Sequence, residues 1–494
     1  MIKDEESTDK YSLRQKIGLV VGLALFALIL FLPIEIHSLS AKRTLAIALL
    51  MATWWVTEAL PIPAVSLLPL VLFPSLGIMD SGEVASQYGH RLIFLFMAGF
   101  LIAMAMQKWD LHKRIALYII RTIGTGPKRL ILGFMVASGF LSMWISNTAT
   151  TMMMATIGLA VVSYVNSASR EENSLTGKLQ TNFGVALMLG IAYSCSIGGI
   201  GTIIGTPPNA LLVAFWESNF NQSISFLEWM VMGVPVVVIL LPIAWWYLTN
   251  ISSPIHLESI PGGDDLIKDK LQELGPMGKG EKIVLVIFSL TALLWIIRSF
   301  LITPYLPMVG DATIGMAMAI ILFMIPVSAN KGEFALDWEW AVKIPWGTLI
   351  LFGGGLALAS AIEKSGLATW IAEKLDWFTS MPLLFFLFIT ITLMVSLTEL
   401  TSNTGTAAMM LPVLAPLASA MGVDFLTLAV PAIIAVSGAF MLPVATPPNA
   451  IVFGTGHVTI PQMVKNGIGL NVIALVIVTG LGYFALGPLI GLIF

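Results

Sequence analysis

Long apolar runs separated by short polar segments recur from one end of the 494-residue chain to the other. Runs such as 16–34, 91–106 and 226–248 have roughly the 20 residues that an α-helix needs to cross about 30 Å of hydrocarbon. The ten-residue alternating segments expected of membrane β-barrel strands are missing from the pattern. The sequence therefore predicts an all-α polytopic membrane protein.

Two apolar stretches, 130–165 and 382–421, are too long for one span and too short for two. Each has a polar Ser-Asn-Thr word near its middle, which starts at Ser146 in the first stretch and at Ser402 in the second. Non-helical backbone at membrane depth is tolerated only where protein buries it or where it lines a polar cavity. We therefore predict a re-entrant helical hairpin near 130–165 and another near 382–421, with the Ser-Asn-Thr words at their tips.

A second word, Thr-Pro-Pro-Asn-Ala, also occurs twice, at 206–210 and at 446–450. Prolines in each copy, and glycines or prolines before it, interrupt the helical pattern, because proline lacks a backbone donor and clashes with the preceding turn. Broken helices are therefore expected near 183–216 and near 425–456. Interrupted segments at matching places in two halves point to the binding site of a transporter.

These words belong to a longer internal repeat. Residues 95–116 align with 351–372 at an offset of 256 (351 − 95), which the Ser-Asn-Thr words share. The Thr-Pro-Pro-Asn-Ala copies differ by 240 (446 − 206), and a polar loop at 165–181 accounts for the difference. An odd number of predicted crossings separates the aligned segments, so the two repeats are expected to be inverted.

The distribution of polar and charged residues defines the predicted organisation. It comprises a cytoplasmic tail (1–15), a first half (16–250), a polar linker (251–282) and a second half (283–494). The tail is too polar and acidic for a signal peptide, so the first span is expected to be retained. Lysine and arginine gather between 108 and 129, a face that the positive-inside rule places in the cytoplasm. Lys42 and Arg43, on the outer side, run against this rule.

Composition narrows the class further. With 57% hydrophobic and 11% charged residues, the chain lies outside the range of soluble domains. Cys195 is the only cysteine, which excludes a disulfide framework and a cysteine metal site within one chain. No motif of a hydrolase or of a nucleotide-hydrolysing transporter is present, and nothing indicates a nucleic-acid partner.

The polar words can bind ions of either sign. Interrupted helices leave free carbonyls and amides near the bilayer midplane, where carbonyl and hydroxyl oxygens suit sodium and helix N-termini suit carboxylates. The residues proposed for two sodium sites are Ser142, Ser146, Asn147, Gly198 and Gly199 in the first half, and Thr398, Thr401, Asn403, Gly438 and Ala439 in the second. The residues proposed to hold the anion are Ser146, Asn147, Thr148, Ser402, Asn403, Thr404, Thr206, Pro207, Thr446 and Pro447.

A single cluster of this kind would more often be an interhelical hydrogen bond, worth about 0.6 kcal/mol. Two pairs of words in register across an inverted repeat favour a binding site instead. Glu58 and Glu399 are intramembrane carboxylates that invite a functional reading, but capping or ion pairing near a segment end explains them equally well.

Four segments, at 43–69, 143–154, 398–412 and 440–454, together resemble the divalent anion:sodium symporter family, which includes dicarboxylate and citrate carriers. The resemblance extends over nearly the whole chain from about Lys16. It implies eleven transmembrane helices, two opposing hairpins, a homodimer, and a scaffold domain with a mobile transport domain that moves as an elevator. It also implies that both Ser-Asn-Thr words bind substrate carboxylates and flank sodium sites.

Two neutral, symmetric polar tips suit a small dianion held at both ends, such as succinate, malate, fumarate or 2-oxoglutarate, with citrate as an extension. A bare dianion cannot cross hydrocarbon, so its charge must be offset by carried sodium or protons, or the anion must be exchanged for another. Sodium symport and anion exchange both remain open, with sodium as the coupling ion in the first case. The alternatives are a sulfate-type carrier, a channel, an intramembrane enzyme and a carboxylate sensor.

Overall fold

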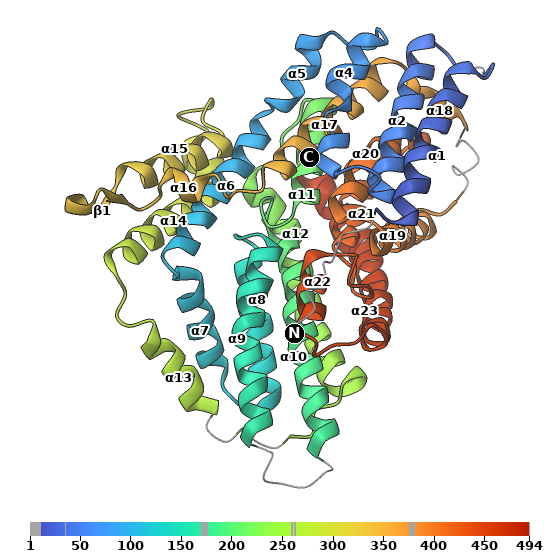
Figure 1. Ribbon diagram of the computed structural model, residues 1–494. Coiled ribbons are helices and arrows are strands. Elements are labelled where there is room, and N and C mark those ends of the chain that lie inside the picture. The colour runs from blue at the N-terminus through green and yellow to red at the C-terminus, as the bar shows by residue number, and fades with distance from the viewer. Residues whose placement is uncertain are drawn as a thin grey trace, which may run out of the picture.

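The computed structural model describes residues 11–34, 36–168, 176–257, 260, 263–374 and 381–493 (Figure 1). Most of the predicted tail at 1–15 and part of the loop at 165–181 therefore lie outside the described residues. The first half contains α1 (Leu13–Phe31), α2 (Leu39–Thr57), α3 (Ile62–Val65), α4 (Leu68–Ser75), α5 (Ser81–Tyr88), α6 (Arg91–Lys108), α7 (Leu111–Ile123), α8 (Pro127–Ser142), α9 (Asn147–Ala168), α10 (Thr176–Gly198), α11 (Pro207–Phe220) and α12 (Phe226–Tyr247).

The described part of the predicted linker contains α13 (Gly263–Glu273) and the start of the next helix. The second half contains α14 (Lys279–Ile297), α15 (Asp311–Met324), α16 (Trp338–Ala341), α17 (Trp346–Lys364), α18 (Leu367–Lys374), α19 (Leu383–Leu400), α20 (Asn403–Ala420), α21 (Phe425–Val436), α22 (Pro447–Gly454), α23 (Ile460–Leu481) and α24 (Gly487–Ile493). Short 3₁₀ or π turns occur at Gly199–Gly201, Leu248–Ser252, Arg298–Ile302, Ala329–Lys331 and Gly482–Leu486.

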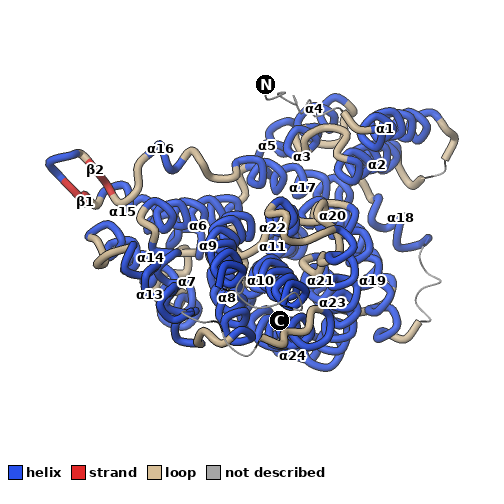
Figure 2. Tube along the Cα trace, turned by 60° about the horizontal axis from the view of Figure 1, so that its bottom comes forward, coloured by secondary structure: helices blue, strands red, loops and turns tan. Residues whose placement is uncertain are grey.

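A small antiparallel sheet is the one departure from an all-α fold among the described residues. It pairs β1 (Pro326–Ser328) with β2 (Glu333–Phe334) at the edge of the molecule (Figure 2). The strands are joined by a turn that ends at Gly332, whose φ of 63° is the left-handed conformation that glycine adopts without cost. The sequence analysis missed this hairpin, because strands of two and three residues are too short to show a period.

The prediction of a polytopic helical protein is confirmed in its coarse form. Within the described residues, nine helical segments are long and apolar enough to cross a membrane. Three shorter apolar helical segments, Ile62–Ser75, Asp311–Met324 and Phe425–Val436, fall below that length. The count of eleven spans stays a prediction.

Local sequence explains where several long helices begin. Ser12 before α1, Ser225 before α12 and Thr459 before α23 each form a capping box with the Gln or Glu three residues later. In a capping box two backbone amides that the helix leaves free are satisfied by side chains. These helix starts are therefore encoded within four residues, independently of the tertiary fold.

The helices pack mainly in two groups, which meet along one seam. The α6 group consists of α2–α6, α14, α15 and α17, with close packing of α6 on α15 and of α5 on α17. The α10 group consists of α8–α12 and α19–α23, with α10 packed on α8, α9 and α22, and α19 packed on α21 and α23. The seam between the groups is formed mainly by α11 and α20 against α17.

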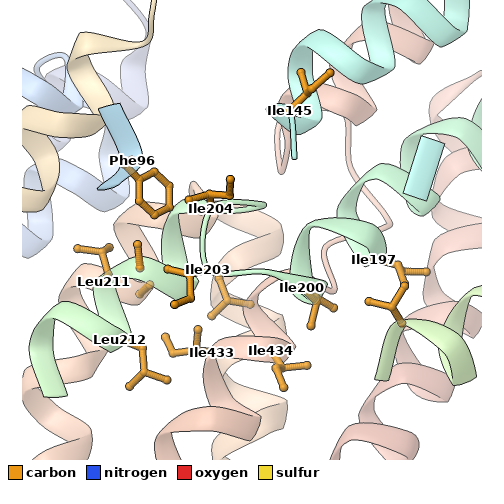
Figure 3. Close-up of a cluster of buried hydrophobic side chains, with 14 of the residues drawn as sticks. Phe96, Ile145, Ile197, Ile200, Ile203, Ile204, Leu211, Leu212, Ile433 and Ile434 are labelled. Atoms are coloured by element: carbon orange, nitrogen blue, oxygen red, sulfur yellow. The ribbon is translucent and has the colours of Figure 1, made fainter. Parts of the chain in front are cut away.

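An apolar cluster fills the space around the break between α10 and α11 (Figure 3). Ile200, Ile203 and Ile204, from the interrupted segment, lie among Phe96 of α6, Leu211 and Leu212 of α11, and Ile433 and Ile434 of α21. All of these side chains are buried. Their close packing supplies dispersion contacts, which matter more than burial from water inside a membrane.

Backbone contact brings hairpin α8–α9 against α10. A Cβ atom on Gly198 would overlap the carbonyl oxygen of Gly139 in α8. Only glycine permits two helices to approach this closely. The glycines before the first Thr-Pro-Pro-Asn-Ala word therefore interrupt a helix and also allow the hairpin to sit beside the interruption.

Candidate functional site

The two Ser-Asn-Thr words begin helices in the same way. Helix α8 ends at Ser142 and α9 starts at Asn147, while α19 ends at Leu400 and α20 starts at Asn403. Ser146 Oγ accepts a hydrogen bond from Ala149 N (3.4 Å), and Ser402 Oγ accepts one from Gly405 N (3.0 Å). Each serine is thus an N-cap, and each Asn-Thr pair occupies the first turn of a helix.

The two Thr-Pro-Pro-Asn-Ala words also begin helices. Thr206 is the N-cap of α11 and Pro207 its first residue, and Thr446 and Pro447 have the same places in α22. Thr446 Oγ1 accepts a hydrogen bond from Asn449 N at 3.3 Å. Proline is well suited to this position, since the first amide of a helix has no partner within the helix.

All four helix starts border one cavity of about 1170 Å³. The ten residues predicted to hold the anion all line it: Ser146, Asn147, Thr148, Thr206, Pro207, Ser402, Asn403, Thr404, Thr446 and Pro447. Free amides and the helix dipole give each of these N-termini about half a positive charge. The cavity can therefore attract an anion without a lysine or arginine beside the tips.

Two residues predicted for the first sodium site, Ser142 and Gly199, contact the side chain of Asn147. Ser142 Oγ donates a hydrogen bond to Asn147 Oδ1 at 2.5 Å. Gly199 lies against the same amide, since a Cβ atom there would be 2.8 Å from Asn147 Oδ1. Ser142 is fully buried and does not line the cavity. Ser142 and Gly199 thus contact Asn147, which lines the cavity, without lining it themselves.

The second half has a matching group. Thr398 Oγ1 lies 2.5 Å from Asn403 Oδ1 and 3.0 Å from Val436 O. A hydroxyl has one proton, so it can satisfy only one of these two acceptors at a time. Thr401, also predicted for this site, has a hydroxyl that bonds within the hairpin to Leu397 O (2.9 Å) and Thr406 Oγ1 (2.6 Å).

Asn209 and Asn449 are site residues that the sequence analysis did not assign, although both lie in the repeated words. Asn209 Nδ2 donates to Gly199 O (3.0 Å) and Thr202 O (2.8 Å). Asn449 Nδ2 donates to Ala439 O and Leu442 O, both at 3.0 Å. In each half the partners lie ten and seven residues earlier, so the two halves fold the interrupted segment in the same way.

These hydrogen bonds reduce the number of free lone pairs on two of the carbonyls predicted to bind sodium. The carbonyls of Gly199 and Ala439 each already accept a hydrogen bond from an asparagine, which leaves one lone pair free on each oxygen. Both asparagine side chains are fully buried, and neither Oδ1 atom has a hydrogen-bond partner among the described residues. Repetition of the asparagine at the same place in both words was the sequence signal for this role.

Glu399 holds the interrupted segment of the second half. Its Oε1 accepts hydrogen bonds from Phe440 N (2.7 Å), Met441 N (2.9 Å) and Asn471 Nδ2 (2.7 Å), and its Oε2 accepts one from Leu442 N (3.2 Å). Successive backbone amides of this kind form an anion-binding concavity, here occupied by a side chain of the protein. The sequence left open whether Glu399 has a functional role or a structural one, as a cap or in an ion pair. The geometry described here fits a cap.

In the first half, a different hydrogen bond connects the hairpin to the broken helix. The repeat offset of 256 aligns Glu399 with Met143 (399 − 256). There the Met143 backbone oxygen accepts a hydrogen bond from Thr202 Oγ1 at 2.5 Å. Glu58, the other intramembrane carboxylate, ends α2 with a φ of 52° and does not line the cavity.

Comparison with known proteins places this arrangement in a class of membrane transporters. Residues 13–492 match the family described as "Sodium:sulfate symporter transmembrane region". The chain belongs to this family, the divalent anion:sodium symporters, and the resemblance noted in the sequence is confirmed.

Individual relatives are similar over the full length. The chain is 46% identical to a protein of Staphylococcus saprophyticus named sodium-dependent dicarboxylate transporter SdcS, covering 99% of this chain and 95% of that protein. It is also 46% identical to the protein of the same name from Staphylococcus aureus, covering 98% and 93%. The crystal structure of the YdaH transporter of Alcanivorax borkumensis shares the fold, with a TM-score of 0.57 at 12% identity, covering 91% of this chain and 99% of that one.

The contacts of Glu399 predict a structural role that a neutral isostere cannot fill. In Glu399→Gln one oxygen becomes an NH₂ group that faces backbone donors, so at least one amide among residues 440–442 loses its acceptor, at about 1–3 kcal/mol. We expect the apparent unfolding midpoint of the purified protein in detergent to fall by several degrees. The control is Glu363→Gln, the same change at an exposed carboxylate. Equal midpoints for the two variants would contradict the capping role.

Proposed function

We propose that this chain is a secondary transporter that carries small dicarboxylates across the membrane together with sodium. The observation that carries this proposal is the single cavity bordered by four helix N-termini, with neutral Ser, Thr and Asn side chains at the tips. Such tips attract carboxylates without binding them as tightly as an arginine would, and a carrier has to release its substrate. The names of the SdcS relatives support the same substrate class and sodium dependence.

The two oxygen clusters are proposed as sodium sites. The first comprises Ser142, Ser146, Asn147 and the Gly198–Gly199 backbone, and the second comprises Thr398, Thr401, Asn403 and the Gly438–Ala439 backbone. Asn147 and Asn403 would link the two functions, since each borders the cavity and also contacts a cluster. A cation beside each asparagine would raise the affinity of the tip for a carboxylate, which couples the ion to the anion.

We further propose that transport is an elevator motion of the α10 group against the α6 group, with the two halves of the chain as inverted repeats. The proposed site belongs to the α10 group, because all four helix starts are in α9, α11, α20 and α22. The α6 group would be the scaffold, and the homodimer implied by the family stays a prediction. The cytoplasmic location of the tail and of the 108–129 face belongs to the same proposal.

The uptake assay described in the next paragraph distinguishes dicarboxylates from other candidate anions. The cavity is large enough for succinate, malate, fumarate, 2-oxoglutarate and citrate, so tricarboxylates belong to the proposal as additional substrates. Sulfate is named in the family description and is the second candidate anion.

The proposal predicts sodium-driven uptake of labelled succinate into proteoliposomes that contain no dicarboxylate. We expect accumulation to require an inward sodium gradient, and to be inhibited by unlabelled malate or fumarate but not by equal sulfate. Uptake only into vesicles preloaded with dicarboxylate, and indifferent to sodium, would instead establish an obligate exchanger. Sodium-driven uptake of sulfate without succinate uptake would refute the dicarboxylate assignment.

The proposed role of the tips predicts that Asn403→Ala and Asn147→Ala abolish this uptake. Each change removes a side chain shared by the cavity and a sodium cluster, and the loss of about 1.5–3 kcal/mol per contact corresponds to roughly 10- to 100-fold. Expression and the unfolding midpoint serve as checks on folding. Asn330→Ala, the same change in the exposed turn between β1 and β2, is the matched control. Unchanged uptake by Asn403→Ala would refute the site.

The elevator proposal predicts that a covalent link between the two groups stops transport. A Cβ atom on Gly99 of α6 would lie 3.5 Å from Cβ of Ile204, within the range of about 3.5–4.5 Å found in disulfides. In a Cys195→Ala background, we expect Gly99→Cys with Ile204→Cys to lose uptake on oxidation and to regain it on reduction. Each single cysteine variant should be indifferent to oxidant. Full activity of the oxidised, cross-linked pair would exclude relative motion between α6 and the interrupted segment at this contact.

A further inference from the structure

Three lysines with partly or fully exposed side chains also line the cavity, and we call this part of the lining its mouth. Lys113 of α7, Lys270 of α13 and Lys343, just after α16, all line it. Two of them are paired, Lys113 with Asp110 and Lys270 with Glu273, both at 2.8 Å. Lys343 has no acidic partner among the described residues; its Nζ lies 3.8 Å from the ring centroid of Trp340, which also lines the cavity.

The position of Lys343 is set by contacts with the end of α6. Asp337 Oδ1 accepts a hydrogen bond from Trp340 N (2.9 Å) and caps α16, and Asp337 Oδ2 pairs with Lys108 Nζ at 2.8 Å. Trp109 Nε1 donates to Ala335 O at 2.8 Å. Lys108, the last residue of α6, and Trp109, which follows it, thus hold the segment that carries Trp340 and Lys343. Because Lys108 offsets the charge of Asp337, this carboxylate leaves the charge of Lys343 uncompensated.

His112 also lines the cavity, and it does not change the charge near Lys343. His112 is buried, and its Nδ1 lies 3.1 Å from Met106 O. Burial lowers the pKa of His112, so the imidazole is neutral at pH 7 and adds no charge. Among the described residues, Lys343 is therefore the lysine of the cavity lining that forms no ion pair with an acid.

We propose that Lys343, seated on Trp340, is a positioning residue that collects the carboxylate dianion at the mouth of the cavity and passes it to the tips. This inference rests on the proposed function and concerns the route to the same site. A lysine ammonium over an aromatic ring keeps its donors free and moves on a flexible stem, so it makes a transient contact with a carboxylate. A single charge at the mouth of a low-dielectric cleft raises the local concentration of an oppositely charged substrate.

A charge with this role changes the rate of entry and leaves the later steps unaffected. Removal of the charge in Lys343→Gln should raise the KM for succinate about threefold on the side to which the cavity opens, with an unchanged maximal rate. The difference should shrink as ionic strength rises, because the Debye length falls from about 30 Å at 0.01 M to about 8 Å at 0.15 M. Lys343→Arg keeps the charge and should behave as the wild type.

The experiment measures initial sodium-driven succinate uptake into right-side-out and inside-out membrane vesicles at constant sodium and two ionic strengths. The variants are Lys343→Gln, Lys343→Arg and the control Lys331→Gln, which removes the same charge from the exposed turn between β1 and β2. A higher KM for Lys343→Gln alone, in one vesicle orientation and at low ionic strength, supports the proposal. A KM equal to that of the wild type in both orientations, or a fall in the maximal rate alone, overturns it. Wild-type vesicles that take up no dicarboxylate overturn the proposed function as well, which separates the two failures.

Discussion

Interrupted helices inside an apolar protein need a hydrogen-bond partner for each free amide and carbonyl, and this requirement explains the polar residues of the two halves. An unpaired backbone group away from water costs several kcal/mol. Asn209 and Asn449 bind the carbonyls of the two interrupted segments, and Glu399 binds three successive amides of the second. The bound segments lead into α11 and α22, which begin at the same cavity as α9 and α20. Cavity, tips and oxygen clusters all depend on these few side chains.

The two halves meet this requirement by similar but not identical means. The asparagine contacts repeat with the same spacing in both halves, whereas Glu399 is matched by Met143. In the first half a hydroxyl of the broken helix, on Thr202, donates to the hairpin backbone; in the second half the hairpin supplies a carboxylate to the broken-helix backbone. The second half therefore carries a buried carboxyl group near its tip that the first half lacks. This asymmetry gives the two proposed sodium sites different electrostatic surroundings.

The cavity combines neutral tips with a charged mouth. The tips themselves contain no lysine or arginine, so the charge of a bound dianion would be offset by helix N-termini and by ions carried with it. The lysines lie on α7, α13 and the segment after α16, where they can attract an anion without holding it in the site. Such a separation of attraction from binding suits a protein that has to release its substrate.

The sequence by itself determined the class of protein, the places where helices are interrupted, and the residues at the tips. Apolar run lengths, paired prolines and repeated polar words are local signals, and local backbone chemistry decides where a helix can start or must end. Tertiary structure alone decided which of these places meet. The convergence of Ser146, Thr206, Ser402 and Thr446 on one cavity, and the reach of Glu399 to residues 440–442, depend on packing between segments far apart in the chain. The β1–β2 hairpin could not be predicted, because its strands are too short to show a period. The unpaired charge of Lys343 could not be predicted either, because only the fold decides which acids lie close to a lysine.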